Sequence, residues 1–350
     1  MGRRLMKPSG RLALKTAGIA LVCILGALAG CKEERKPEQA AHAAAPTAKP
    51  QVALVMKTLT NPFFAEMERG ARQAAAEEGA NILVKAASKE TSIDQQIGII
   101  DALVHDKVAA IVVAPGDSVR LIPPLKTAQD AGIVVVNVDN RLDPAFAKTL
   151  DFKAPPFVSI DNERAAYAVT RRLIAALPAR TTGAVEAAVI EGIPDANNSA
   201  ERKAGALKAF GEAPNIRVVA VQSGNWRIEE GYAAARTILR EHPHVKLIFC
   251  ANDMMALGVV RYLADSKTSG VLVAGFDALP EARRAIASGA LVASADQNAR
   301  QQGYLGVKAA MTLLKGAPVE PATQLDATVI DSANADVPTT PATAPQVTAP

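Results

Sequence analysis

The sequence predicts an α/β fold made of two lobes, each built around a largely parallel β-sheet. From about residue 51 to 332, short apolar, β-branched runs alternate with helical stretches of ten residues or more. This alternation is typical of parallel sheets with right-handed crossovers. The length suggests two domains. The pattern occurs as two successive series, the second starting near Val158, so we expect two similar lobes facing each other across a cleft.

The first series opens with a strand from Val52 to Met56 and a helix from Pro62 to about Gly79. Asn61 is a suitable N-cap, proline fits the first helical position, and glycine commonly follows the last one. Further strands are expected at 82–84, 110–113 and 133–138. Helices are expected between them, one with Ile93, Ile97, Ile100 and Val104 on one face and one containing Leu121 and Leu125.

The second series supplies strands of similar length separated by helical stretches. These strands are expected at 185–190, 218–221, 247–249, 271–274 and 291–293. Cys250 lies at the end of one of these apolar runs and is interpreted as a small buried hydrophobic residue.

The first thirty residues predict a lipoprotein signal peptide. Five basic residues precede a short apolar stretch, Thr16 to Leu28, which is too short to span a bilayer comfortably. The stretch ends in Leu28-Ala29-Gly30-Cys31, which resembles a bacterial lipobox, so Cys31 is the expected lipidation site. An ordinary secretory leader with an incidental cysteine is the alternative. Residues 31–50 are expected to be a disordered tether and 333–350 a disordered tail.

The charge of the mature chain argues against a nucleic-acid partner. The whole chain carries +4, and the leader holds five basic and no acidic residues, which leaves −1 for the remainder. The sequence shows no basic stripe with interleaved aromatic residues. It also lacks the glycine-rich nucleotide loops, the nucleophile elbow and the His-Glu-x-x-His zinc motif. We therefore expect a binding protein rather than an enzyme, with no cofactor and no metal.

Polar and aromatic residues follow the predicted strands at positions where turn residues would suffice. The carboxyl ends of strands in open α/β sheets are the usual place for ligands. Aromatic residues make up only 4 % of the chain, yet several occur at these ends, including its one tryptophan. The residues that we expect at the site are Lys57, Asn61, Phe63, Phe64, Asp139, Asn140, Arg202, Trp226, Asn252, Asp277 and Gln297.

Several of these residues have an ordinary structural alternative. Asp139, Asn252 and Asp277 are also acceptable turn or cap residues, Arg202 a solvated helix charge, and Trp226 a core residue. Together they favour a site for a neutral polyol. Planar carboxylate, amide and guanidinium groups pair with neighbouring hydroxyls, and aromatic faces cover the C–H face of a sugar.

Several segments resemble the ribose-type periplasmic sugar-binding proteins of ABC importers, especially the allose-type members. The resemblance is carried by Leu54 to Phe64, Asn137-Val138-Asp139, Phe249 to Gly258, Pro280 to Arg283 and Gln297-Asn298. It implies a type I periplasmic binding protein fold with a three-strand hinge. Lys57 stands where allose-type binders carry lysine and ribose-type binders serine. Asn140 departs from both, because arginine or an acidic residue is usual there.

The resemblance also implies domain boundaries and partners. The crossings between lobes should fall near 159–161, 296–297 and 327–329. The N-terminal lobe would then comprise 51–159 and 297–326, and the C-terminal lobe 160–296 and 327–332. The implied function is capture of a monosaccharide, a hexose such as allose, or ribose or a polyol, by lobe closure. A lipid-anchored monomer in the cell envelope would deliver the sugar to an ABC permease. The alternative is a sensor that presents its ligand to a chemoreceptor or kinase.

Overall fold

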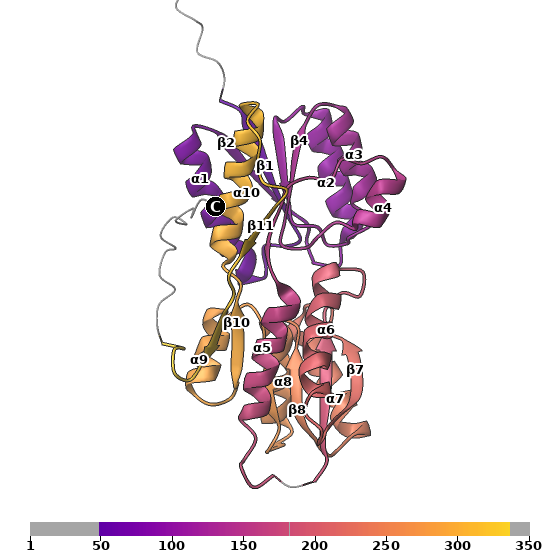
Figure 1. Ribbon diagram of the computed structural model, residues 1–350, viewed down its shortest axis with the longest axis vertical. Helices are drawn as coiled ribbons and strands as arrows, with labels where there is room; N and C mark the ends of the chain where they lie inside the picture. The colour runs from indigo at the N-terminus through magenta and orange to yellow at the C-terminus, as the bar shows by residue number, and fades with distance from the viewer. Residues whose placement is uncertain (1–48, 182, 337–350) are drawn as a thin grey trace, which may run out of the picture. The chain divides into compact units, whose positions relative to one another are not determined.

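Two six-stranded sheets with the same strand order organise the chain (Figure 1). The computed structural model describes residues 49–181 and 183–336. The leader, Cys31, nearly all of the tether and most of the tail lie outside these residues. The alternation of strands and helices confirms the predicted α/β fold class.

The first sheet has the order β2-β1-β3-β4-β5-β11, and each of its neighbouring pairs is parallel. Its strands are β1 (Gln51–Met56), β2 (Asn81–Ala86), β3 (Ala110–Val113), β4 (Val134–Val138), β5 (Phe157–Ile160) and β11 (Ala322–Leu325). Helices α1 (Pro62–Glu78) and α10 (Ala299–Leu314) cover one face. Helices α2 (Ile93–His105) and α3 (Ile122–Asp130) cover the other, and the short α4 (Pro144–Thr149) follows β4.

The second sheet repeats this order as β7-β6-β8-β9-β10-β12. Its strands are β6 (Val185–Glu191), β7 (Ile216–Ser223), β8 (Val245–Cys250), β9 (Leu272–Ala274), β10 (Ala293–Asp296) and β12 (Thr328–Asp331). Strand β12 is the exception to the parallel pattern, because it pairs antiparallel with β10. The helices are α5 (Asn162–Ala175), α6 (Asn197–Gly211), α7 (Ile228–Glu241), α8 (Asp253–Asp265) and α9 (Pro280–Ala287).

The alternation of side chains along β1 explains how the first sheet buries both faces. Val52, Leu54 and Met56 belong to one apolar cluster, which also contains residues of α1 and α10. Ala53 and Val55 point the other way, into the cluster built with α2 and α3. All five side chains are fully buried, as expected for a parallel strand with helices on both sides.

The chain passes between the two sheets three times. It leaves the first sheet after β5, returns after β10, and crosses again between β11 and β12. Strand β5 pairs with β4 and β11, so it completes the first sheet and does not start a second series at Val158. The second series starts at β6. The residue boundaries of the two lobes remain a prediction.

The first four residues of the expected tail, 333–336, belong to the described part of the chain. Residues 333–336 form a turn that is bonded back to β12. The side chain of Asn334 donates to the Val329 carbonyl, and Ala335 is buried. The composition of this segment gave no sign of a buried apolar residue, but Ala335 is one.

Candidate functional site

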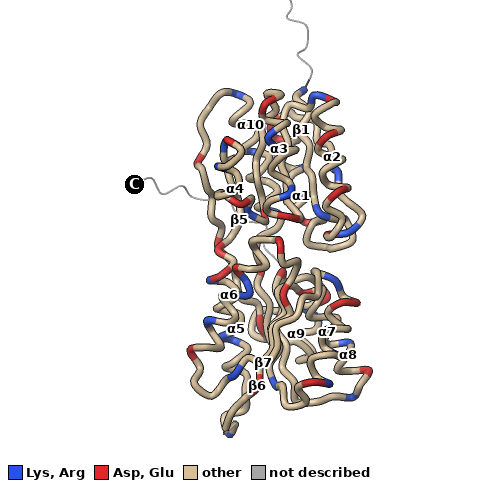
Figure 2. The backbone as a smooth tube through the Cα atoms, turned by 90° about the vertical axis from the view of Figure 1, so that its right-hand side faces the viewer, with Lys and Arg blue, Asp and Glu red and all other residues tan. Residues whose placement is uncertain are grey.

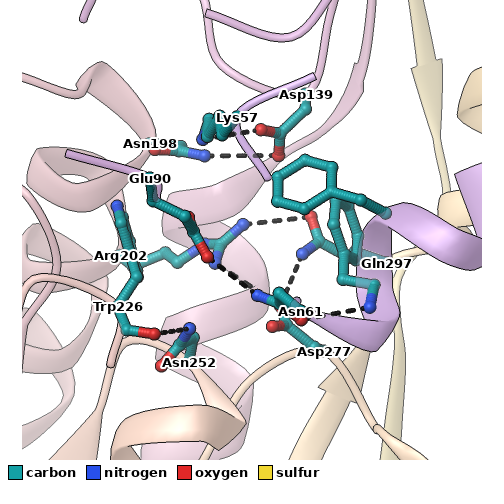
Figure 3. A pocket seen from close by; sticks show the side chains of 12 residues that line it. Lys57, Asn61, Glu90, Asp139, Asn198, Arg202, Trp226, Asn252, Asp277 and Gln297 are labelled. Carbon is teal, nitrogen blue, oxygen red and sulfur yellow. Dashed lines mark hydrogen bonds and ion pairs between the residues drawn. The ribbon is translucent and has the colours of Figure 1, made fainter. Parts of the chain in front are cut away.

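A pocket with an empty volume of about 230 Å³ lies at the carboxyl ends of strands from both sheets. In each sheet the strand order reverses beside β1 or β6, where α/β folds bind ligands. The lining residues are Lys57, Asn61, Phe63, Phe64, Glu90, Asp139, Asn198, Arg202, Trp226, Asn252, Asp277 and Gln297 (Figure 3).

Ten of the twelve lining residues were expected from the sequence, and their roles as ligand contacts remain a prediction. Asn140 does not line the pocket, because its buried side chain is engaged elsewhere: its Nδ2 donates to the Pro115 carbonyl at 3.0 Å and to the Ser118 hydroxyl at 3.2 Å. Glu90 and Asn198 were missed. Glu90 follows β2, so the strand-end argument that gave the other residues extends to it.

The first wall of the pocket is the start of α1. The Oδ1 atom of Asn61 accepts from the Phe63 backbone N–H at 3.1 Å, which makes Asn61 the N-cap of the helix. Its Nδ2 donates to Glu90 Oε1 at 3.0 Å. The Phe63 and Phe64 rings meet edge to face with centroids 5.1 Å apart. Two adjacent rings at the start of a helix lead one to expect that one of them is exposed. In the structure both rings are buried and line the pocket.

A buried ion pair spans the first lobe between the ends of β1 and β4. Lys57 Nζ lies 2.8 Å from Asp139 Oδ2, and both side chains are almost fully buried. Asn198, from the start of α6, donates its Nδ2 to the other oxygen of Asp139 at 3.3 Å. The aspartate is therefore held from both lobes. Removal of either partner would destabilise the fold, because the remaining charge would be buried alone.

Arg202 organises the second wall through three charge-assisted donations. Its Nε donates to Asn162 Oδ1 at 2.9 Å, and its terminal nitrogens donate to the Ala251 carbonyl and Gln297 Oε1, each at 3.0 Å. The guanidinium lies over the Phe276 ring at 4.0 Å from the centroid. Bonded on its edge and stacked on its face, Arg202 is fixed in position.

Asp277 completes this cluster from the loop after β9. Its Oδ1 accepts from Gln297 Nε2 at 2.6 Å and lies 3.7 Å from Arg202. Burial raises the pKa of Asp277 well above its usual value, and the Arg202 guanidinium opposes that rise. Burial also lowers the pKa of Arg202, which the carboxylates of Asp277 and Asp139 counteract.

Glu90 is a third buried carboxyl in the pocket. Burial raises its pKa from 4.5 to about 7, while Lys57 and the hydrogen bond from Asn61 pull it down. Lys57 and Arg202 therefore face Asp139, Asp277 and a carboxyl that titrates near neutrality. Elsewhere along the described chain, basic and acidic residues are interspersed (Figure 2).

Trp226 forms a flat side of the pocket, and its polar edge is unpaired. A Cβ at Gly192 would lie 2.0 Å from the indole ring, so only glycine leaves room for the ring at this place. Asn252 holds the segment by donating its Nδ2 to the Trp226 carbonyl at 3.2 Å. The buried Trp226 Nε1 and Asn198 Oδ1 atoms have no hydrogen-bond partner in the protein. A buried donor and a buried acceptor of this kind point to a ligand that satisfies both.

Three lining residues adopt backbone conformations that are rare for residues other than glycine. Asp139, Trp226 and Asp277 have φ values of 63°, 65° and 120°. Such conformations cost on the order of 1–3 kcal/mol each and concentrate at binding sites. All three residues line the pocket.

The arrangement suits recognition of a small polyhydroxylated molecule. Fixed carboxylate, amide and guanidinium groups surround the space, and rings bound it. Within residues 49–181 and 183–336, no group of three or more His, Cys, Asp and Glu side chains is placed to hold a metal ion. None of the helices described is both long and apolar enough to cross a bilayer.

Comparison with known proteins gives consistent matches over this whole region. The model of a family described as periplasmic binding protein domain matches residues 52–318. The D-ribose/D-allose-binding protein of Pseudomonas aeruginosa is 38 % identical over 80 % of this chain and 86 % of that protein. The D-allose-binding periplasmic protein of Escherichia coli is 33 % identical over 77 % and 86 %. A solute-binding protein of Actinobacillus succinogenes, solved with bound D-allose, is 34 % identical, covers 82 % of this chain and 99 % of its own, and has a TM-score of 0.76.

Proposed function

The chain belongs to the periplasmic binding protein family, and from this premise we propose that it captures a monosaccharide for a sugar ABC transporter. Its relatives are binding proteins, so it is not an enzyme. Two unpaired buried atoms, Trp226 Nε1 and Asn198 Oδ1, carry the proposal. A sugar hydroxyl can accept from the first and another can donate to the second, which a purely apolar ligand cannot do.

The charge balance of the pocket supports a neutral sugar. Lys57 is already paired with Asp139, and Arg202 lies beside Asp277. An anionic or cationic ligand would upset these pairs, whereas hydroxyl groups can add to the remaining lone pairs and N–H groups. Lys57 and the allose-type relatives favour a six-carbon aldose such as allose, with ribose or a polyol as alternatives.

Hinge closure around the ligand is the mechanism that fits this geometry. The pocket takes lining residues from the start of α1 and the segments after β1, β2 and β4 on one side, and from α6 and the segments after β7, β8 and β9 on the other. A sugar that contacts both sides binds the closed state better than the open one and shifts the population toward it. We propose that the closed protein, a monomer anchored to a membrane through lipid on Cys31, then delivers the sugar to the permease.

Calorimetric titration of the purified protein against pentoses, hexoses, polyols and inositols tests the proposal. We expect one aldose to bind with a Kd on the order of micromolar, about −8 kcal/mol. The variant Asp101→Asn changes an exposed carboxylate outside the pocket and should bind like the parent. Absence of heat with every sugar and polyol would remove the proposed function. Loss of sugar uptake in a deletion strain tests delivery to the permease separately.

A further inference from the structure

The start of α6 is capped by side chains of the opposite lobe. The residue at the N-cap position of this helix is Ala196, which has no side-chain oxygen to offer. The first backbone N–H groups of a helix lack partners within the helix and need acceptors from elsewhere. Here the Asn197 N–H donates to Ser118 Oγ at 2.9 Å, and the Asn198 N–H donates to Asn140 Oδ1 at 3.0 Å.

These contacts form a small network on one side of the pocket. Ser118 lies in the loop after β3 and Asn140 in the loop after β4, so both belong to the first sheet. They are buried and bonded to each other through Asn140 Nδ2 and Ser118 Oγ at 3.2 Å. The Ser118 backbone N–H donates to the Asp195 carbonyl at 3.0 Å, which adds a third bond between the lobes, donated in the opposite direction. We call Ser118, Asn140 and residues 195–198 the clasp.

We propose that the clasp sets the affinity for sugar by stabilising the closed arrangement of the lobes, without selecting among sugars. This inference rests on the proposed function. The three clasp bonds join protein atoms of the two lobes directly, and neither Ser118 nor Asn140 lines the pocket. When the lobes separate, the two helix N–H groups exchange these acceptors for water. Each clasp bond therefore contributes to the free energy of closure, and it raises the affinity for every sugar by the same factor.

Asn198 couples the clasp to the pocket. Its backbone N–H belongs to the clasp, while its side chain donates to Asp139 and presents the unpaired Oδ1 to the ligand space. The two sets of contacts meet at this residue, but the clasp uses its backbone and the ligand space its side chain. Ser118 and Asn140 are positioning residues in this scheme, because they act through α6 and make no contact with the sugar.

The test compares Ser118→Ala and Asn140→Ala with Gln96→Ala. Gln96 is the matched control: it is buried, and its amide makes two bonds to the same loop, to the Ala114 carbonyl and the Gly116 N–H, each at 2.8 Å and within the first lobe. For each clasp variant we expect the Kd of every bound sugar to rise by the same factor, about three- to tenfold. The rise should come from faster dissociation, with the preference between two sugars unchanged. Gln96→Ala should lower the melting temperature while its Kd stays within about twofold of the parent.

Three results would overturn the clasp: unchanged Kd values in both clasp variants, a changed order of preference among sugars, or an equal loss of affinity in Gln96→Ala. The second result would mean direct contact with the ligand. Failure of the proposed function itself is distinct, because the parent protein would then bind none of the sugars. Ser118→Ala is the milder substitution and keeps the test available if Asn140→Ala does not fold.

Discussion

Replacement of the buried carboxyl Glu90 by glutamine should change how stability depends on pH. Glutamine keeps an oxygen that can accept from Asn61 Nδ2, but it stays neutral at every pH. In the native protein the pKa of Glu90 is raised from 4.5 to about 7, mainly by burial. At 1.36 kcal/mol per pKa unit, this rise corresponds to about 3 kcal/mol.

The sign follows from proton binding. Between pH 4.5 and about 7 the native state holds a proton on Glu90 that the unfolded state has lost. The stabilisation linked to this proton is complete below pH 4.5 and is lost as the pH rises to about 7. The variant has no such loss, so its free energy of unfolding relative to the parent should improve by up to about 3 kcal/mol from pH 4.5 to pH 8.

Chemical denaturation of both proteins at pH 4.5, 6 and 8 measures this difference. Asp253 also has a pKa raised to about 7, but it is present in both proteins and its contribution largely cancels. The exposed Glu320 provides the matched control, because Glu320→Gln should give a difference from the parent that does not vary over this range. A Glu90→Gln difference that is equally flat would refute the argument from burial.

The remaining predictions concern the pocket and the anchor. Asp139→Asn should reduce sugar affinity more than tenfold and should also destabilise the fold, by about 3–5 kcal/mol, because Lys57 would stay buried without its partner; calorimetry and denaturation measure the two effects, and parental affinity would exclude a ligand role. Trp226→Ala should weaken binding by about 1–3 kcal/mol, and sugar should alter the fluorescence of this lone tryptophan in the parent; a silent titration with a sugar that binds by calorimetry would contradict its place at the ligand. Cys31→Ser should move the protein from the membrane fraction to the soluble one, and unchanged partitioning would argue against lipid anchoring.

The sequence carried most of the fold because its local patterns agree with one another. The start of the α1 helix was predictable from Asn61 and Pro62, and its end from Gly79, and the structure has the helix at Pro62–Glu78. The sheet to which each strand belongs was harder to predict from the sequence. The β5 run reads like any other parallel strand, and only its pairing with β4 and β11 assigns it to the first sheet.

The site was predictable where a residue directly follows a strand and less so where a loop intervenes. Glu90 lies four residues beyond the end of β2, in a loop without aromatic residues. Asn198 looked like one of several polar residues at a helix start. Asp139 has a φ of 63° and its side chain pairs with Lys57, whereas the side chain of the neighbouring Asn140 bonds to Pro115 and Ser118. Such backbone angles arise from the tertiary fold and leave little trace in a single sequence.

The empty position beneath the indole has a consequence for how the specificity of this protein can change. Gly192 does not line the pocket, yet a Cβ there would lie 2.0 Å from the Trp226 indole, so any larger residue would force this lining ring to shift. A single methyl group at residue 192 would therefore change the shape of the pocket and leave its polar groups in place. A substitution at residue 192 can therefore alter which sugars fit, although this residue does not line the pocket.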